Sequence, residues 1–203
     1  MELEAILALD INYGLSKNNK IPWKCKKDML FFYNKTKDNI VIMGKNTYFS
    51  LPEKNRPLKN RLNIILTKNP QYYIFGNNNI NQFNNLIFTN NVNIYQEILN
   101  NKERYNELFP FLNKDFKIYI IGGNEIYSIY FPLCSNIWIS YIKGNYDCDL
   151  FFNKNIINKI ENICDVNNCL ISNNYKKEEE NNEYIKEIYY ENEELKIIKY
   201  IKT

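Results

Sequence analysis

The most informative absence in this sequence is histidine, of which the 203 residues contain none. A Ser-His-Asp triad, an imidazole acid or base, and most zinc sites are therefore excluded. Alanine and arginine are scarce, with two and three residues respectively. Any chemistry performed by this chain must use carboxylates, amides, backbone groups or a bound cofactor, and we expect no metal site.

Cysteine, charge and the lack of long apolar runs limit the location and the partners. The five cysteines form no C-x-x-C pair, and their odd number argues against a secreted disulfide framework, so we expect a reducing, cytoplasmic compartment. The residues from Met1 to Glu4 include two acids and no basic group, which disfavours a secretory signal. No apolar run approaches the roughly 20 residues of a membrane span. The net charge of +3 is too small to indicate nucleic-acid binding.

The pattern of apolar residues indicates the fold class. Short apolar runs bounded by turn residues predict strands at residues 3–9, 39–43, 62–67, 85–88, 116–121 and 137–142. Helix-like segments lie between them, at residues 27–36, 45–50, 94–101 and 125–131. This alternation predicts an α/β fold, a single domain with a central, mostly parallel twisted β-sheet flanked by helices.

The C-terminal part of the chain differs from the rest. Residues 184–190 and 195–201 flank an acidic turn and predict antiparallel strands. Residues 76–85 are mostly asparagine, and residues 173–183 combine asparagine with lysine and glutamate. Both polar segments are expected to be solvated surface insertions.

Three of the predicted strands end in residues that suit a phosphate. Gly122 and Gly123 follow one strand and open a helix, the sequence Met-Gly-Lys-Asn-Thr at 43–47 follows another, and Leu-Thr-Lys at 66–68 follows a third. Backbone N–H groups at such strand-to-helix turns can bind phosphate oxygens. Because parallel strands end at the same edge of a sheet, the pattern predicts one phosphate-rich ligand along that edge.

A single carboxylate lies in an apolar segment after the first strand. Asp28 follows the turn-rich loop 12–20 and the dipeptide Pro22-Trp23. If Asp28 begins a helix, Phe32 shares its face. A lone carboxylate on an apolar face is costly without a partner, which favours a functional role. The alternative is a solvent-facing acid that stabilises the start of a helix.

In this order the motifs resemble those of the dihydrofolate reductase family, over residues 3–153. Residues 50–61 (Ser-Leu-Pro-Glu-Lys-Asn-Arg-Pro-Leu-Lys-Asn-Arg) are similar to the eukaryotic-type form of that family. Pro22-Trp23, Met43-Gly44-x-x-Thr47, Gly122-Gly123 and Asp149-x-Phe151 follow its order and approximate spacing. The resemblance implies one dihydrofolate reductase-like domain over residues 1–203, with an extended C-terminal tail from about residue 171.

The resemblance also implies an activity and a set of catalytic residues. The activity is the NADPH-dependent reduction of 7,8-dihydrofolate to 5,6,7,8-tetrahydrofolate, which serves one-carbon metabolism and thymidylate synthesis. The implied catalytic residues are Asp28, Trp23 and Ile21. In this family the acid bonds the N3 and 2-amino edge of the pterin, and the loop 12–23 is a mobile flap over the nicotinamide. Arg61 is expected to clamp the α-carboxylate of the glutamate tail, because a planar guanidinium makes two parallel bonds that Lys cannot.

The implied binding residues fall into two sets. The substrate set is Ile6, Leu7, Ala8, Asp28, Phe32, Leu51, Arg61, Ile121 and Ser140. The NADPH set is Ala8, Leu15, Ser16, Lys17, Asn19, Lys20, Ile21, Gly44, Lys45, Asn46, Thr47, Leu66, Thr67, Lys68, Ile121, Gly122, Gly123, Asn124, Glu125, Ile126 and Tyr127. Within the second set, Lys45 and Lys68 are expected to face the 2′-phosphate and to favour NADPH over NADH.

The sequence is compatible with two other functions. The pyrimidine reductase of riboflavin synthesis resembles this fold and uses NADPH, but does not need Asp28 with Phe32 or the Arg61 clamp. A folate-binding or RNA-binding protein that kept the fold and lost turnover is the other alternative, although no catalytic position is missing. We expect a monomer that binds neither nucleic acid nor membrane. The chain is too short to include a thymidylate synthase, which is expected at most as a separate partner.

Overall fold

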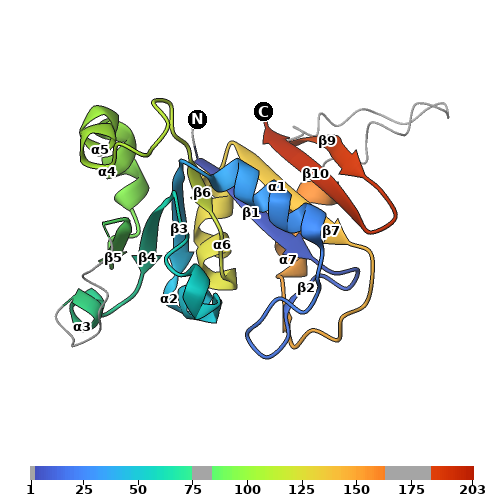
Figure 1. Ribbon diagram of the computed structural model, residues 1–203. Helices are drawn as coiled ribbons and strands as arrows, with labels where there is room; N and C mark the ends of the chain where they lie inside the picture. The colour runs from blue at the N-terminus through green and yellow to red at the C-terminus, as the bar shows by residue number, and fades with distance from the viewer. Residues whose placement is uncertain (1–2, 75–83, 163–183) are drawn as a thin grey trace.

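The computed structural model describes residues 3–74, 84–162 and 184–203, and it has one large sheet with helices on both faces (Figure 1). The strand order is β5-β4-β3-β6-β1-β7-β10-β9. The strands from β5 to β7 are parallel to one another, and β10 and β9 continue the sheet antiparallel to β7. The predicted fold class, a mostly parallel sheet with antiparallel C-terminal strands, is confirmed.

The elements follow one another in an alternating order. The strands of the large sheet are β1 (Leu3–Leu9), β3 (Ile40–Gly44), β4 (Leu62–Leu66), β5 (Leu86–Thr89), β6 (Ile118–Ile120), β7 (Asn136–Ile142), β9 (Tyr184–Glu191) and β10 (Leu195–Lys202). The α-helices are α1 (Lys26–Thr36), α2 (Lys45–Ser50), α3 (Pro70–Ile74), α4 (Ile94–Asn100), α5 (Lys102–Leu108), α6 (Asn124–Tyr130) and α7 (Lys154–Asn162). Short 3₁₀ turns cover Glu53–Asn55 and Phe131–Leu133, and β2 (Gly14–Ser16) pairs with β8 (Leu150–Phe151) in a separate small sheet.

The central strands are apolar on both faces because both faces are covered. Alternate side chains of β1 enter two different clusters: Leu3, Ala5 and Leu7 pack with residues of α6, whereas Ile6 packs with Trp23 and Trp138. Phe31 and Phe32 of α1 pack against the second cluster. A strand that is buried on both faces reads as a continuous apolar run, which is why periodicity located these strands.

Several elements were not predicted from the sequence. The strands β2 and β8 and the helices α3, α5 and α7 are additional to the expected set. In α5 only Tyr105 is buried, so the segment has almost no apolar periodicity. The strand predicted at 116–121 is shorter and covers Ile118–Ile120; Phe116 instead closes the preceding turn, because its N donates to Asn113 O. The expected insertion 173–183 and most of 76–85 lie outside the described residues, but Asn85 is half-buried and hydrogen-bonded.

Within the described residues, no helix is both long enough and apolar enough to cross a membrane. The three cysteines in this part of the chain, Cys25, Cys134 and Cys148, are buried free thiols.

A buried carboxylate joins three strands at the edge where β1 begins. Glu4 is only 1% exposed. One of its oxygens accepts from Trp138 Nε1 (2.7 Å), and the other accepts from Lys117 Nζ (2.6 Å) and Asn136 Nδ2 (3.1 Å). The donors come from β7 and from the residue preceding β6, so this single side chain holds β1 to both of its neighbours.

Replacing Glu4 by Gln is expected to lower the free energy of unfolding by about 1–3 kcal/mol, because an amide cannot accept from all three donors and Lys117 loses its counter-charge. Urea unfolding of the two proteins measures the difference. Glu191→Gln is the control, because Glu191 forms exposed pairs with Lys143 and Lys196 that water screens. An equally small effect of both substitutions would show that the Glu4 cluster is not a strand junction.

Candidate active site

Asp28 lies in the first turn of α1, half-buried, with its side chain near Trp23 and Ser140. Burial raises the pKa of Asp28 above its ordinary value, and the Ser140 hydroxyl and Trp23 indole partly oppose this rise. Neither group reaches the geometry of a hydrogen bond: Trp23 Nε1 and Ser140 Oγ are buried without a hydrogen-bond partner within the described residues. Buried polar groups are normally satisfied, so a carboxylate beside two unsatisfied groups marks a place for a polar ligand or water.

Apolar side chains surround this carboxylate. Ile6 and Ala8 of β1 lie on the same face of the sheet as Trp138, and Phe32, Leu51 and Ile121 pack against the same cluster. Leu7 points to the opposite face and enters the core with α6. Of the predicted wall residues, Leu7 can therefore contribute only its backbone to this side. The result is an apolar slot with one charged group, which is the usual form of a small-molecule site.

Arg61 is a buried cation at the start of β4. It is 5% exposed, and it forms no ion pair within the part of the chain that the structure describes. Its Nε donates to Lys59 O (3.0 Å) and its Nη1 donates to Thr36 Oγ1 (3.0 Å). Counting bonds to described residues, three of its five N–H groups remain for a ligand. Burial lowers the pKa of Arg61. A buried charge without a counter-charge is costly, so this side chain favours an anionic ligand.

The ends of β3 and β6 form a cradle without side chains. Gly44 N donates to Gly122 O (2.7 Å), and a cis peptide joins Gly122 to Gly123. The φ of Gly122 is 109°, which disfavours any residue with a Cβ, and a Cβ there would lie 3.0 Å from the Tyr127 ring. A Cβ at Gly123 would lie 3.3 Å from Thr47 Oγ1, so Thr47 borders the cradle. At both glycines a Cβ would meet atoms of the chain itself, so these residues let the backbone at this edge pack closely against Tyr127 of α6 and against Thr47.

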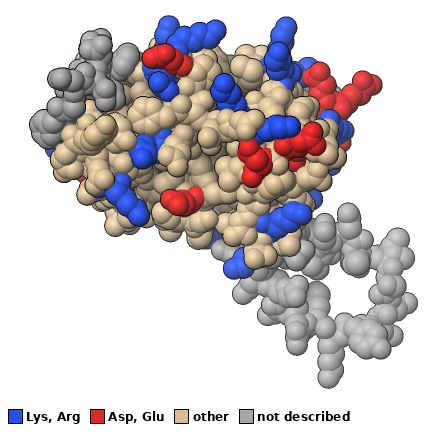
Figure 2. All heavy atoms as spheres, turned by 90° about the horizontal axis from the view of Figure 1, so that it is seen from below, with Lys and Arg blue, Asp and Glu red and all other residues tan. Residues whose placement is uncertain are grey.

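The predicted cofactor residues of α2, β4 and α6 line the same edge of the sheet. Leu66 ends β4, and Thr67 N continues the edge by donating to the carbonyl oxygen of Thr89, the last residue of β5 (2.9 Å). Lys45 and Lys68 are exposed. Figure 2 views the molecule from this side and shows the acidic side chains gathered mostly in the half nearer β2. The half nearer β4 and β5 is thus the more favourable one for an anion.

The residues of α6 contribute differently. Ile126 and Tyr127 are buried, and Tyr127 OH donates to Ile6 O (2.9 Å), which joins α6 to β1. Asn124 Nδ2 donates to Phe151 O (2.7 Å) of β8. Glu125 is exposed. Of these four predicted cofactor residues, Ile126 and Tyr127 therefore have their side chains in the core, where they pack against the strand ends and do not face a ligand.

The segment from Asp10 to Trp23 is a loop whose base is held by the Asp10 carboxylate. Asp10 accepts from the N–H groups of Asn12, Gly14 and Tyr146 (2.8, 2.8 and 3.2 Å). Burial alone would raise the pKa of Asp10, but these hydrogen bonds together hold it below its ordinary value. The Trp23 ring contacts the Tyr146 ring edge-on, with 5.5 Å between centroids.

The tip of this loop is at the surface. Lys17 and Lys20 exchange backbone hydrogen bonds of 2.9 and 3.0 Å, and Asn18 N donates to Asp149 Oδ2 (2.7 Å). Ile21 is 63% exposed. Leu15 and Ser16 are in β2, which pairs with β8, and Asn19 has a positive φ of 57°. The predicted flap is therefore anchored at both ends and exposes an apolar residue between them.

Some residues of the site were not found from the sequence. Thr36 is completely buried, donates to Phe32 O (2.7 Å) and accepts from Arg61. Asn63 is also completely buried and bonds the backbone of Leu58 and Arg61. The available signal was weak: a Thr in a last helical turn and an Asn inside an apolar strand. An unexplained polar residue in an otherwise apolar strand is nevertheless a usable signal of a buried hydrogen-bond network.

Comparison with known proteins gives a consistent family. The family model described as dihydrofolate reductase matches residues 2–191. A viral dihydrofolate reductase of Saimiriine herpesvirus 2 (strain 488) is 48% identical over 73 residues, which cover 32% of this chain and 34% of that protein. Dihydrofolate reductases of Mus musculus and Ureaplasma parvum serovar 3 are 43% and 49% identical over 74 and 65 residues, in each case 32% of this chain and 40% of the relative.

The curated relatives match this chain over only part of their length. The matched segments span about a third to two fifths of the length of these curated relatives. A solved structure, the dihydrofolate reductase from Enterococcus faecalis complexed with NADP(H) and RAB-propyl, covers 99% of this chain and 96% of its own with a TM-score of 0.60. At 20% identity this likeness concerns the fold.

Proposed function

This chain belongs to the dihydrofolate reductase family, and we propose that it reduces 7,8-dihydrofolate to 5,6,7,8-tetrahydrofolate with NADPH. The observation that carries the proposal is the half-buried Asp28 beside two buried polar atoms, Trp23 Nε1 and Ser140 Oγ, that have no hydrogen-bond partner among the described residues. The pterin edge presents N–H donors to a carboxylate in an apolar slot. A bound pterin, with water, satisfies all three groups.

The substrate lies between Asp28 and Arg61, which are at the two ends of one apolar slot. Phe32 packs in the same cluster as Ile6, and the Arg61 guanidinium lies 5.8 Å from the Phe32 ring centroid. Asp28 bonds the pterin, and Arg61 bonds the α-carboxylate of the glutamate tail. The two charged anchors have opposite signs, so they fix the direction in which the substrate lies.

Asp28 contributes to the chemistry through its charge. The reaction needs a proton at N5 and a hydride at C6 of the pterin. A carboxylate bonded at the N3 and 2-amino edge cannot reach N5, so the proton comes from water. The negative charge of Asp28, in a site with little water, stabilises the N5-protonated pterin. Trp23 Nε1 and Ser140 Oγ are the groups near Asp28 that can bond the water which delivers the proton.

The strand-end cradle fits NADPH. We place the pyrophosphate against the backbone of Gly122 and Gly123, where Thr47 offers a hydroxyl beside Gly123. NADPH supplies the hydride when it is bound. Lys45 and Lys68 supply positive charge for the 2′-phosphate, and closure of the Asp10–Trp23 loop brings the exposed Ile21 over the nicotinamide end and excludes water.

A direct assay tests the proposed function. Purified protein is mixed with NADPH and dihydrofolate, and the loss of NADPH absorbance is followed. Oxidation of NADPH is expected only when both compounds are present, with tetrahydrofolate as the product. Binding of dihydrofolate without turnover would contradict the proposal and favour a binding protein that kept the fold.

Cofactor choice gives a separate prediction. Lys68→Ala is expected to weaken NADPH binding and to leave NADH binding almost unchanged, and the loss should shrink as the salt concentration rises, because exposed charge pairs are screened. Titration of both cofactors at low and high salt measures this. Lys114→Ala is the matched control: it removes the same charge from an exposed residue before β6, at the opposite edge of the sheet. Equal losses for NADPH and NADH would place Lys68 outside the 2′-phosphate site.

The cellular setting is part of the same proposal. A cytoplasmic location is supported by the buried free thiols of Cys25, Cys134 and Cys148. We also propose that the enzyme is a monomer. The product serves one-carbon metabolism and thymidylate synthesis, so a separate thymidylate synthase is the proposed functional partner, and co-purification of the two enzymes tests for contact between them.

A further inference from the structure

The turn that carries Arg61 is held by hydrogen bonds to all four of its carbonyl groups. Leu58 O accepts from Asn63 Nδ2 (2.9 Å), and Lys59 O accepts from Arg61 Nε (3.0 Å). Asn60 O accepts from Asp38 N (2.7 Å), and Arg61 O accepts from Asn63 Nδ2 (2.8 Å). The φ of Asn60 is 55°, a left-handed conformation that asparagine tolerates better than most residues. The direction of the Arg61 side chain therefore depends on these bonds.

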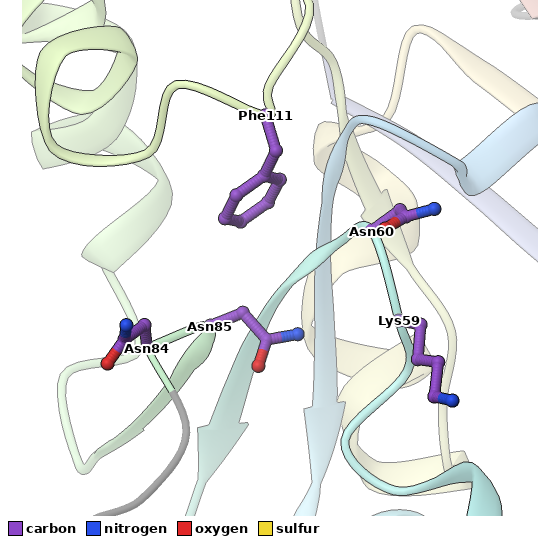
Figure 3. A pocket seen from close by; sticks show the side chains of 5 residues that line it. All are labelled: Lys59, Asn60, Asn84, Asn85 and Phe111. Carbon is purple, nitrogen blue, oxygen red and sulfur yellow. The ribbon is translucent and has the colours of Figure 1, made fainter.

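A second asparagine reaches the same turn from β5. Asn85, which precedes β5, donates through Nδ2 to Leu58 O (3.2 Å) and to Arg61 O (3.0 Å). Figure 3 shows its side chain pointing from the start of β5 toward the segment that contains Lys59 and Asn60. The backbone oxygen of Asn85 in turn accepts from Asn63 N (2.8 Å) and Asn63 Nδ2 (3.3 Å). Leu58 O and Arg61 O thus each accept from both asparagines.

Among the described residues, side chains are not closely packed on this side of the turn. A cavity of about 330 Å³ lies beside it, lined by Lys59, Asn60, Asn84, Asn85 and Phe111 (Figure 3). Where neighbouring atoms are not closely packed, a turn can shift at little cost unless hydrogen bonds prevent it. The Asn85 amide is the contact that crosses from β5 to the turn at this place.

We propose that Asn85 is a positioning residue for Arg61, the residue proposed to bind the α-carboxylate of the glutamate tail. The Asn85 amide fixes the carbonyls of Leu58 and Arg61, and it thereby holds the Arg61 guanidinium next to Thr36 and in position to bond the substrate carboxylate. This inference rests on the proposed function of the site. Asn85 does not touch the substrate, and it acts only through Arg61. Its effect must therefore be confined to ligands that have the glutamate tail.

The test measures KM and kcat of Asn85→Ala with dihydrofolate and with a dihydropterin that lacks the tail. We expect KM for dihydrofolate to rise by roughly 3- to 10-fold, the effect of losing one hydrogen bond between Arg61 and the substrate carboxylate. The kcat should not change, and neither should the KM for the tail-less substrate. The rise should disappear when Asn85→Ala is made in an Arg61→Lys background, since a residue that acts through Arg61 has nothing to position there. Asn84→Ala, a neighbour that lines the same cavity, should match the wild type.

The results that would contradict the role of Asn85 differ from those that would contradict the proposed function. An equal rise in KM for both substrates, or a rise that persists in the Arg61→Lys background, would show that Asn85 is merely structural. If Asn85→Ala does not fold, Asn85→Ser, which keeps one donor, is measured by the same criteria. A wild-type protein without dihydrofolate turnover would refute the proposed function itself. Turnover together with tail discrimination by Arg61, but an unchanged Asn85→Ala, would refute only this inference.

Discussion

Replacing Asp28 by Asn is expected to slow hydride transfer at neutral pH by roughly 10²- to 10⁴-fold, the usual range for the loss of an acid–base group. Asparagine keeps the shape and much of the hydrogen bonding of Asp28, but removes the charge that favours the N5-protonated pterin. Ligand affinity is expected to change much less than the rate. Single-turnover stopped-flow measurements separate the rate from affinity.

The pH dependence of the same variant is the sharper measurement. Its hydride-transfer rate should recover as pH falls from about 8 to about 5, because substrate that is already protonated in solution no longer needs the carboxylate. A rate close to that of the wild type at neutral pH, or no recovery in acid, would contradict this role for Asp28.

The thermal stability of the Asp28→Asn variant is the control that separates loss of catalysis from loss of folding. Because burial raises the pKa of Asp28 in the folded state, the folded protein binds the proton more tightly than the unfolded chain does. The ligand-free protein therefore loses stability as pH rises from the unfolded pKa of about 3.9 through the raised folded value. The neutral amide of the Asp28→Asn variant carries no such cost, so its thermal unfolding at neutral pH should occur at the same or a higher temperature than in the wild type.

Arg61→Lys is expected to weaken dihydrofolate binding by about 2–5 kcal/mol, a rise in the dissociation constant from about 30-fold to a few thousand-fold. Lysine cannot form the two parallel bonds of a guanidinium, and it also loses the contacts with Lys59 O and Thr36 Oγ1. Quenching of the intrinsic tryptophan fluorescence during titration measures the binding of both dihydrofolate and a pterin that lacks the tail.

The expected result is selective. The tail-less pterin should bind the variant as it binds the wild type, and Arg104→Lys, a change at an exposed arginine, should leave both ligands unaffected. Comparable weakening of both ligands would show that Arg61 supports the fold and does not clamp a carboxylate.

The order of the elements and the fold class followed from the sequence because they depend on local patterns. A strand buried on both faces has to be apolar throughout, so β1, β3, β4 and β7 were found within one or two residues. The Gly122-Gly123 pair was informative for a similar reason, since few residues fit a backbone with a φ of 109°. Asp28 and Arg61 were identified by the resemblance of their surrounding segments, and their roles remain predictions until the variants are measured.

Tertiary structure alone decided which polar residues are buried and what they bond. Glu4 looks like an acid in a charged N-terminus, yet its partner Trp138 is 134 residues away. Asn85 reads as part of an asparagine-rich surface segment, but it bonds a turn 24 residues earlier, and Thr36 bonds Arg61 across 25 residues. Likewise, the face of the sheet toward which Leu7 points depends on the register of β1 with β6 and β7. Hydrogen bonds of this kind join side chains that the folding of the sheet brings together, and no local period in the sequence records them.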